Sequence, residues 1–203
     1  QVEIEWKSFQ LDPGIVPQPD KNVYEYLAER KGMSVEDSKQ MHAGVVARAA
    51  AVGLDYHFEK AVISNSFDAH RLIQLAKTKG LGDSIEETFF KAYFTEGRDL
   101  NDKDTLMELC VGIGLNALDV KEVLEDETRF ANAVRSDISE AQQIGVRGVP
   151  FFVFDRRLAV AGAQPPEVLL QVLDPDEMDF PFRGRVRFQS MGGGLTHETQ
   201  SAD

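Results

Sequence analysis

Cysteine is almost absent from this 203-residue sequence, in which Cys110 is the only one. A single cysteine excludes an intrachain disulfide, a cysteine metal cluster and a Cys-x-x-Cys redox pair within these residues. Histidine is scarce too, and the spacing of the four histidines matches neither HExxH nor a comparable ligand motif. We therefore expect no metal site. The histidines are His42, His57, His70 and His197.

Basic residues are also few, since 22 Lys and Arg stand against 34 Asp and Glu, a formal net charge of −12. Nucleic-acid binding requires clustered Lys and Arg, so we expect no nucleic-acid partner. The sequence has no apolar run of membrane-spanning length, and its start shows no basic-then-apolar secretory signal. We therefore expect no membrane contact and a cytoplasmic location.

The first residues alternate apolar and charged side chains. Val2, Ile4 and Trp6 are each followed by a charged residue. A period of two with one charged face predicts a strand at the edge of a sheet. The turn residues Asp12-Pro13-Gly14 and a proline-containing linker follow it.

Helical patterns then dominate as far as Ile144. Apolar residues recur every three or four positions, and side chains that cap helices precede several of these stripes. The last predicted helix ends at Gly145, where glycine suits a helix C-terminus. Helices are predicted to begin near Asp20, Ser34, Ser66 or Asp68, Asp83, Asp102 and Asp119.

The pattern changes after Pro150. Two short apolar runs, 151–154 and 158–161, flank Asp155-Arg156 and predict a tight hairpin. Pro165 and Pro166 suit the first turn of a closing helix. From Asp174 onward the composition is that of a poorly ordered tail, with a candidate strand over 185–189.

Residues 145–154, read Gly-Val-Arg-Gly-Val-Pro-Phe-Phe-Val-Phe, are the most informative stretch. Proline has no N–H for a sheet ladder, so Pro150 suits the start of a strand. An X-Pro bond adopts the cis form more readily than any other, which would turn the backbone groups of Arg147 and Val149 outward. An extended peptide or a thiol ligand can pair with such a loop. The plainer alternative is an ordinary helix-to-strand connection, and the hairpin that follows favours the ligand-binding interpretation.

The order of elements, with Gly148-Val149-Pro150 before a hairpin, resembles the thioredoxin fold, and the large helical insertion resembles DsbA-like proteins. Within these, the sequence is similar to the FrnE branch, relatives of 2-hydroxychromene-2-carboxylate isomerase and kappa-class glutathione transferase. The resemblance extends from the first residue to about Leu173. It is carried by residues 6–13, 65–72, 145–154 and 162–164.

The resemblance implies an α/β fold in which a thioredoxin-like sheet carries a large inserted α-helical subdomain. Residues 1–19 and 145–173 would form the thioredoxin-like part, residues 20–144 the insertion and residues 174–203 a C-terminal tail. Family members begin with a strand and a Cys-x-x-Cys motif that opens a helix. Both are missing here, so either the chain is truncated or another segment fills their place, and we favour truncation.

The activity implied by the resemblance is that of a thiol–disulfide oxidoreductase or isomerase acting on protein or small-molecule disulfides or thiols. No catalytic residue can be carried over, so these residues alone would be inactive in redox exchange. The implied substrate-binding residues are Gly148, Val149 and Pro150, with Arg147 beside them. Arg147 would lower a thiol pKa or bind a glutathione carboxylate, although an exposed arginine is more often a solvated turn residue.

The same resemblance places Asn65, His70 and Arg71 near the mouth of a cleft. The alternative is that Asn65 and Ser66 cap a helix while His70 packs or faces water. Cys110 lies on an apolar helical stripe and is expected to be a buried, inert side chain.

Two other functions remain open. One is a glutathione-dependent isomerase or transferase, for which glutathione would be the bound thiol; no other cofactor is implied. The other is a non-catalytic peptide-binding or chaperone module, which agrees with the missing redox pair.

Overall fold

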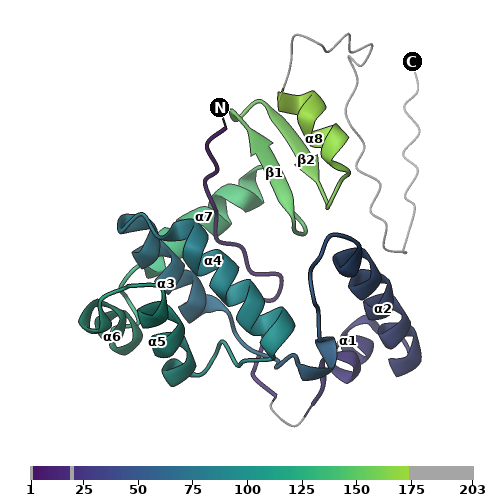
Figure 1. Cartoon of the computed structure of the whole chain (residues 1–203), viewed down its shortest axis with the longest axis horizontal. Coiled ribbons are helices and arrows are strands. Elements are labelled where there is room, and N and C mark those ends of the chain that lie inside the picture. The colour runs from purple at the N-terminus through teal and green to yellow at the C-terminus, as the bar shows by residue number, and fades with distance from the viewer. Residues whose placement is uncertain (1, 19–20, 174–203) are drawn as a thin grey trace. The chain divides into compact units, whose positions relative to one another are not determined.

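The computed structural model describes residues 2–18 and 21–173. They fall into two compact units that divide the chain between Gly145 and Val146, and each unit is described by itself. The first unit is helical (Figure 1). Its elements are α1 (Val23–Lys31), α2 (Val35–Ala51), the short 3-10 helix η1 (Phe58–Lys60), α3 (Phe67–Thr78), α4 (Gly82–Lys91), the π-helical turn η2 (Ala92–Glu96), α5 (Lys103–Gly112), α6 (Ala117–Glu125) and α7 (Ala131–Gln143).

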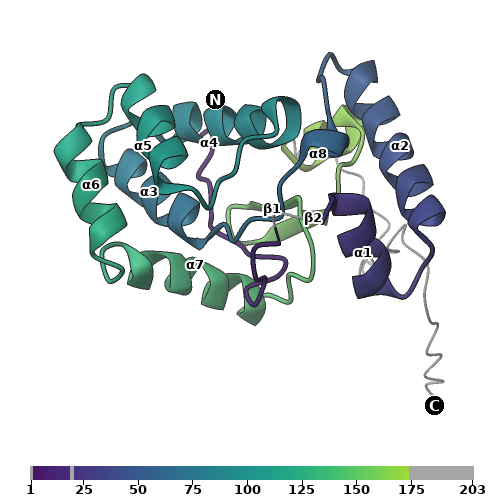
Figure 2. The same cartoon turned by 90° about the horizontal axis from the view of Figure 1, so that it is seen from below.

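Helix α3 lies among α4, α6 and α7, against which it packs (Figure 2). Its apolar residues recur at helical spacing and are buried, Leu72 completely. They join Ile85 of α4, Leu106 of α5 and Val120 of α6 in one hydrophobic cluster. The start of α3 is therefore held rigidly by burial of the turns that follow it.

Capping side chains define where the helices begin, as expected from the sequence. Two of the predicted caps are confirmed: Ser34 Oγ accepts a hydrogen bond from the Asp37 N–H, and Asp102 accepts from the Thr105 N–H. Gly145 follows α7 with a φ of 81°, a backbone conformation that glycine adopts without strain.

Three helices begin at other residues than predicted. Asn22, rather than Asp20, caps α1 in a capping box with Glu25. Asn116, rather than Asp119, caps α6 by accepting from two N–H groups of the first turn. Helix α4 begins at Gly82 without a capping side chain, so Asp83 lies inside its first turn. For α4 and α6, an aspartate that is favourable inside a first turn was taken for the cap.

The strand predicted for the first residues was wrong. Residues 2–10 form no strand, and Val2 and Ile4 are exposed. Side chains take up the backbone groups that a neighbouring strand would bind: Lys77 Nζ donates to the Trp6 carbonyl at 2.9 Å, and the Ser8 N–H donates to Asp137 Oδ2 at 3.0 Å. Residues 2–7 are all exposed, so the apolar face that the alternation predicted is not buried, and a strand also needs a partner strand.

A buried carboxylate anchors this segment. Asp137 of α7 is 8% exposed, and its Oδ2 accepts from the Ser8 N–H and from Gln74 Nε2 of α3, the latter at 2.7 Å. Gln74 also donates to Ser8 Oγ at 3.1 Å, and Lys7 Nζ lies 3.5 Å from Asp137 Oδ1. A buried charge is tolerated only when it is bonded and compensated in this way. The cluster fixes the N-terminal segment against α3 and α7.

The second unit is a hairpin followed by a helix. Strands β1 (Phe151–Phe154) and β2 (Leu158–Ala161) are antiparallel, with Phe152 opposite Val160, and α8 (Pro166–Leu173) follows. Asp155 and Arg156 both have positive φ, as at the central positions of a type I′ turn, and the Arg157 N–H donates to the Phe154 carbonyl at 2.9 Å. Because Phe154 is opposite Leu158, the hairpin loop comprises the three residues 155–157. The predicted hairpin and closing helix are confirmed, whereas the candidate strand over 185–189 lies outside the described residues.

Replacing Asp137 by alanine leaves the Ser8 N–H and the Gln74 amide without their acceptor. We expect Asp137→Ala to lower the free energy of unfolding by about 2–3 kcal/mol, because each buried donor loses its bond. Urea denaturation followed by circular dichroism measures this change. Glu140→Ala on the same helix, at an exposed position, serves as the control and should change stability by less than about 0.5 kcal/mol. Equal effects of the two variants would contradict the anchoring role.

Candidate functional site

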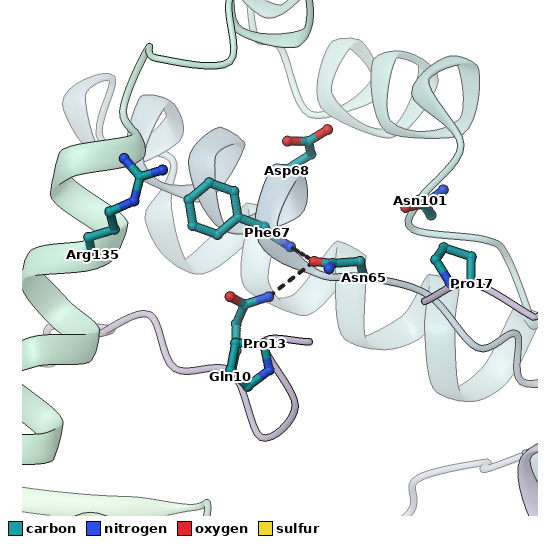
Figure 3. A pocket seen from close by; sticks show the side chains of 8 residues that line it. All are labelled: Gln10, Pro13, Pro17, Asn65, Phe67, Asp68, Asn101 and Arg135. Atoms are coloured by element: carbon teal, nitrogen blue, oxygen red, sulfur yellow. Dashed lines mark hydrogen bonds between the residues drawn. The ribbon is translucent and has the colours of Figure 1, made fainter. Parts of the chain in front are cut away.

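A cavity of about 500 Å³ opens in the first unit (Figure 3). Its volume falls within the usual range for small-ligand sites. The lining residues come from the N-terminal segment, the start of α3, the turn before α5 and the middle of α7. They are Gln10, Pro13, Pro17, Asn65, Phe67, Asp68, Asn101 and Arg135.

The N-terminal wall of the cavity is shaped by the predicted turn. The Ile15 N–H donates to the Asp12 carbonyl at 3.2 Å, which reverses the chain around Pro13. Pro13 and Pro17 therefore both lie on the cavity, and proline holds such a segment in few conformations.

Asn65 connects this wall to α3. Its Oδ1 accepts from the Phe67 N–H at 3.0 Å and from Gln10 Nε2 at 3.1 Å, and its Nδ2 donates to the Ile15 carbonyl at 3.3 Å. Figure 3 shows the first two bonds converging on one oxygen. Asn65 thus lines the cavity and also satisfies an N–H of the first turn of α3, whereas Ser66 makes no capping hydrogen bond. The two interpretations of Asn65, as a residue of a cleft and as a helix cap, are therefore compatible.

Arg71 does not line the cavity. It is 0% exposed, and its NH1 donates to the backbone carbonyls of Asp126 and Arg129, at 2.7 and 3.2 Å, in the connection before α7. Its Nε and NH2 each lie 3.1 Å from Asp68 Oδ1. Arg71 therefore acts on the cavity through Asp68, which it holds and neutralises.

His70 is half-buried on α3. Burial lowers its pKa, and the Phe9 carbonyl and Asp137 offset this only in part, so the imidazole is neutral near pH 7. Within the described part of the chain, its Nδ1 has no hydrogen-bond partner. His70 is not among the residues that line the cavity.

Cys110 is 0% exposed in the core, and burial raises the pKa of its thiol to about 12. The expected burial of Cys110 is confirmed, and a buried, protonated thiol is a poor nucleophile because thiol exchange requires the thiolate. Across residues 2–18 and 21–173, no three His, Cys, Asp or Glu side chains are placed to hold a metal ion. In the same residues, no helix combines the length and the apolar character that crossing a membrane requires.

The second unit carries the other predicted residues. The Val149–Pro150 peptide bond is cis. The Gly162 N–H donates to the Pro150 carbonyl at 2.8 Å, which ties Pro150 to the end of β2. Val149, just before this paired region, is 52% exposed, and Arg147 is exposed as well. The structure thus brings Arg147, Gly148, Val149 and Pro150 together in one loop before β1.

A family model described as the DSBA-like thioredoxin domain matches residues 1–174. The chain belongs to this family. It is also similar to the crystal structure of the probable DsbA oxidoreductase SCO1869 from Streptomyces coelicolor, with 38% identity and a TM-score of 0.78 over 91% of this chain and 78% of that one. The uncharacterized protein YwbO of Bacillus subtilis (strain 168) is 23% identical, over 87% of this chain and 83% of its own length.

Family membership confirms the α/β class and the DsbA-like thioredoxin fold, in a chain whose described part is mostly helical with a small two-stranded sheet. The general kind of protein is therefore an oxidoreductase of the thiol–disulfide family. The division into residues 1–19 with 145–173, 20–144 and 174–203 stays a prediction.

Several cavity residues were not singled out from the sequence. Gln10, Phe67 and Asp68 lie inside two of the four stretches that carried the family resemblance, 6–13 and 65–72, so the signal was present but not resolved to single residues. Asn101 and Arg135 carried no local signal. Only the packing of α7 beside α3 brings Arg135 to Phe67, with the guanidinium carbon 5.5 Å from the ring centroid.

The buried thiol leads to a direct prediction. At pH 8 a thiol with a pKa of about 12 is roughly one part in ten thousand ionised, so Cys110 of the folded chain should not react with Ellman's reagent within minutes. After unfolding in urea, the same sample should release one equivalent of chromophore per chain. Rapid stoichiometric labelling of the folded chain would contradict this account of Cys110.

Proposed function

We propose that this chain forms the substrate-binding part of a thiol–disulfide oxidoreductase or isomerase of the FrnE kind, acting on disulfide-containing or thiol substrates. The observation that carries the proposal is the Gly148-Val149-Pro150 loop, exposed at the start of β1 in a chain of the DSBA-like family. The 38% identity with a probable DsbA oxidoreductase supports the same activity.

The loop is suited to bind an extended chain beside a sulfur atom. Val149 precedes the paired part of the hairpin and is exposed, so its backbone N–H and carbonyl can pair with a substrate chain in the manner of an added strand. Pro150 has no N–H that would compete for the same acceptor. Gly148 adds no side-chain bulk, and the exposed Arg147 places a positive charge that favours a thiolate nearby.

The chemistry requires two thiols. An attacking thiolate forms a bond to one sulfur of the substrate disulfide and expels the other sulfur as a thiolate. A second thiol then displaces the substrate from this mixed disulfide, which leaves the pair oxidised and the substrate reduced. Cys110 cannot take either part, because it is buried and protonated. The pair must therefore be supplied from outside these 203 residues.

The sequence of the intact gene product upstream of Gln1 tests this requirement. We expect a Cys-x-x-Cys motif that follows a strand and opens a helix, and two additional titratable thiols in the purified product. A serine or a single cysteine at that place would rule out the redox-pair mechanism and favour the glutathione-dependent alternative.

Val149→Pro removes the backbone N–H proposed to bind substrate and leaves an apolar side chain in its place. In the redox-active gene product, we expect this change to lower kcat/KM for insulin reduction about 5- to 10-fold, the loss expected for one hydrogen bond. Val149→Ala keeps the N–H and should stay within twofold of the parent. Circular dichroism checks that both variants are folded. Equal activity of the proline variant and the parent would contradict the role of the Val149 N–H.

One observation favours a second candidate function, a non-catalytic peptide-binding or chaperone module: the only thiol of this chain is buried. Insulin reduction by the 203-residue chain alone separates the two, because clear turnover would rule out the non-catalytic candidate. Isothermal titration with glutathione addresses the isomerase or transferase alternative, for which tight saturable binding is expected. The cytoplasmic location stays a prediction.

A further inference from the structure

Arg135 is an uncompensated cation at the cavity of the first unit. It is exposed on α7, and in the part of the chain that the structure describes no carboxylate lies within 4 Å of its guanidinium group. Its placement is not arbitrary, because the guanidinium carbon lies 5.5 Å from the centroid of the Phe67 ring. Such a cation–π contact orients the group without using its N–H donors. The donors remain available to a ligand.

Asp68, the acidic residue of the cavity, does not neutralise Arg135. Its Oδ1 is shared by Nε and NH2 of the buried Arg71, each at 3.1 Å. Arg71 is wholly buried and needs this compensation itself, so the Asp68 charge belongs to that pair. The positive charge of Arg135 is therefore not balanced by a residue of the cavity. A ligand carboxylate can balance it and can accept two parallel hydrogen bonds from the guanidinium group.

The other polar side chains that line the cavity are amides. Asn65 is committed, since both of its polar atoms hold the walls of the cavity together. Between the described residues, Gln10 Oε1 and the side-chain amide of Asn101 form no hydrogen bond. In Figure 3, Arg135 and Asn101 stand on opposite sides of the cavity, and Gln10 lies between them and lower in the view. When a ligand carboxylate binds Arg135, Gln10 Oε1 and the Asn101 side-chain amide can pair with the N–H and carbonyl groups of a peptide backbone attached to it.

The apolar part of the lining fits the same ligand. Pro13, Pro17 and Phe67 offer rings that cover an extended chain without competing for its hydrogen bonds. The volume of about 500 Å³ suits a short segment rather than a folded partner.

We propose that this cavity binds a carboxylate carried by an extended peptide, with Arg135 as its clamp. The carboxylate comes from an acidic side chain or from a peptide C-terminus. The inference deepens the proposed function, on which it rests for its biological meaning: it makes acidic peptide segments a preferred class of thiol or disulfide substrate. The binding itself needs no thiol, so it can be tested separately.

Three cysteine-free peptides test the proposal by titration into the 203-residue chain, followed by amide chemical shifts in NMR. They are Ac-Ala-Glu-Ala-Ala-NH2, its glutamine counterpart Ac-Ala-Gln-Ala-Ala-NH2, and Ac-Ala-Gln-Ala-Ala with a free C-terminus. We expect saturable millimolar binding of at least one carboxylate peptide, with shifts at Asn65 and Asn101, and none for the neutral peptide. The two charged peptides distinguish a side-chain from a C-terminal source.

Substitutions of Arg135 test whether this residue binds the carboxylate. Arg135→Gln should weaken binding of the carboxylate peptide about tenfold, the effect of one charge-assisted hydrogen bond, and Arg135→Lys should weaken it less. Arg129→Gln changes the net charge equally at an arginine that pairs with Glu122, away from the cavity lining, and should leave binding within twofold. Thermal unfolding checks that each variant is folded.

The proposal is overturned if the neutral peptide binds as well as the charged ones, if no carboxylate peptide binds saturably, or if Arg135→Gln and Arg129→Gln weaken binding equally. Because the probes contain no sulfur, these results leave the proposed thiol–disulfide activity untouched. A failure of insulin reduction in the gene product would likewise leave peptide binding intact.

Discussion

The buried carboxylate of Asp137 is the interaction on which the first unit's cavity depends. The N-terminal segment belongs to no strand or helix, so nothing local holds it in place. Asp137 and Gln74 bind its backbone and side chain at Ser8, two residues before Gln10 enters the cavity wall. A polar cluster of this kind is specific in direction, because each donor and acceptor has one geometry in which it is satisfied. Hydrophobic packing alone would leave the segment free to slide.

At the start of α3, one acidic residue of the site is paired within the protein, and one basic residue beside it is left for a ligand. Asp68 and Arg71 neutralise each other, and Arg71 also ties α3 to the connection before α7. This pairing leaves Arg135 as a cation at the cavity, held over Phe67 by its ring. Arg135 can therefore bind a ligand carboxylate, because Asp68 is already paired with Arg71. The same logic explains why the buried Cys110, close-packed in the core, contributes stability and no chemistry.

Several parts of the fold that follow from short-range rules were predicted correctly, although the starts of α1, α4 and α6 were not. The 155–156 turn, the caps at Ser34 and Asp102 and the helix after Pro165 each depend on residues a few positions apart. The N-terminal strand failed because strand formation depends on a partner that no local pattern supplies. Asn65 was placed near a cleft through the family resemblance, whereas Arg71, quoted with it, proved to be a buried structural residue.

The sequence by itself determined that these residues hold one cysteine and no redox pair, and that a proline precedes an apolar hairpin, because composition and turn chemistry need no partner. It also carried the family resemblance on which the oxidoreductase assignment rests. Only the tertiary structure decided which arginine faces the cavity and which is buried. That choice depends on how α7 packs beside α3, which is a balance of contacts between residues far apart in the chain and is invisible to any local pattern.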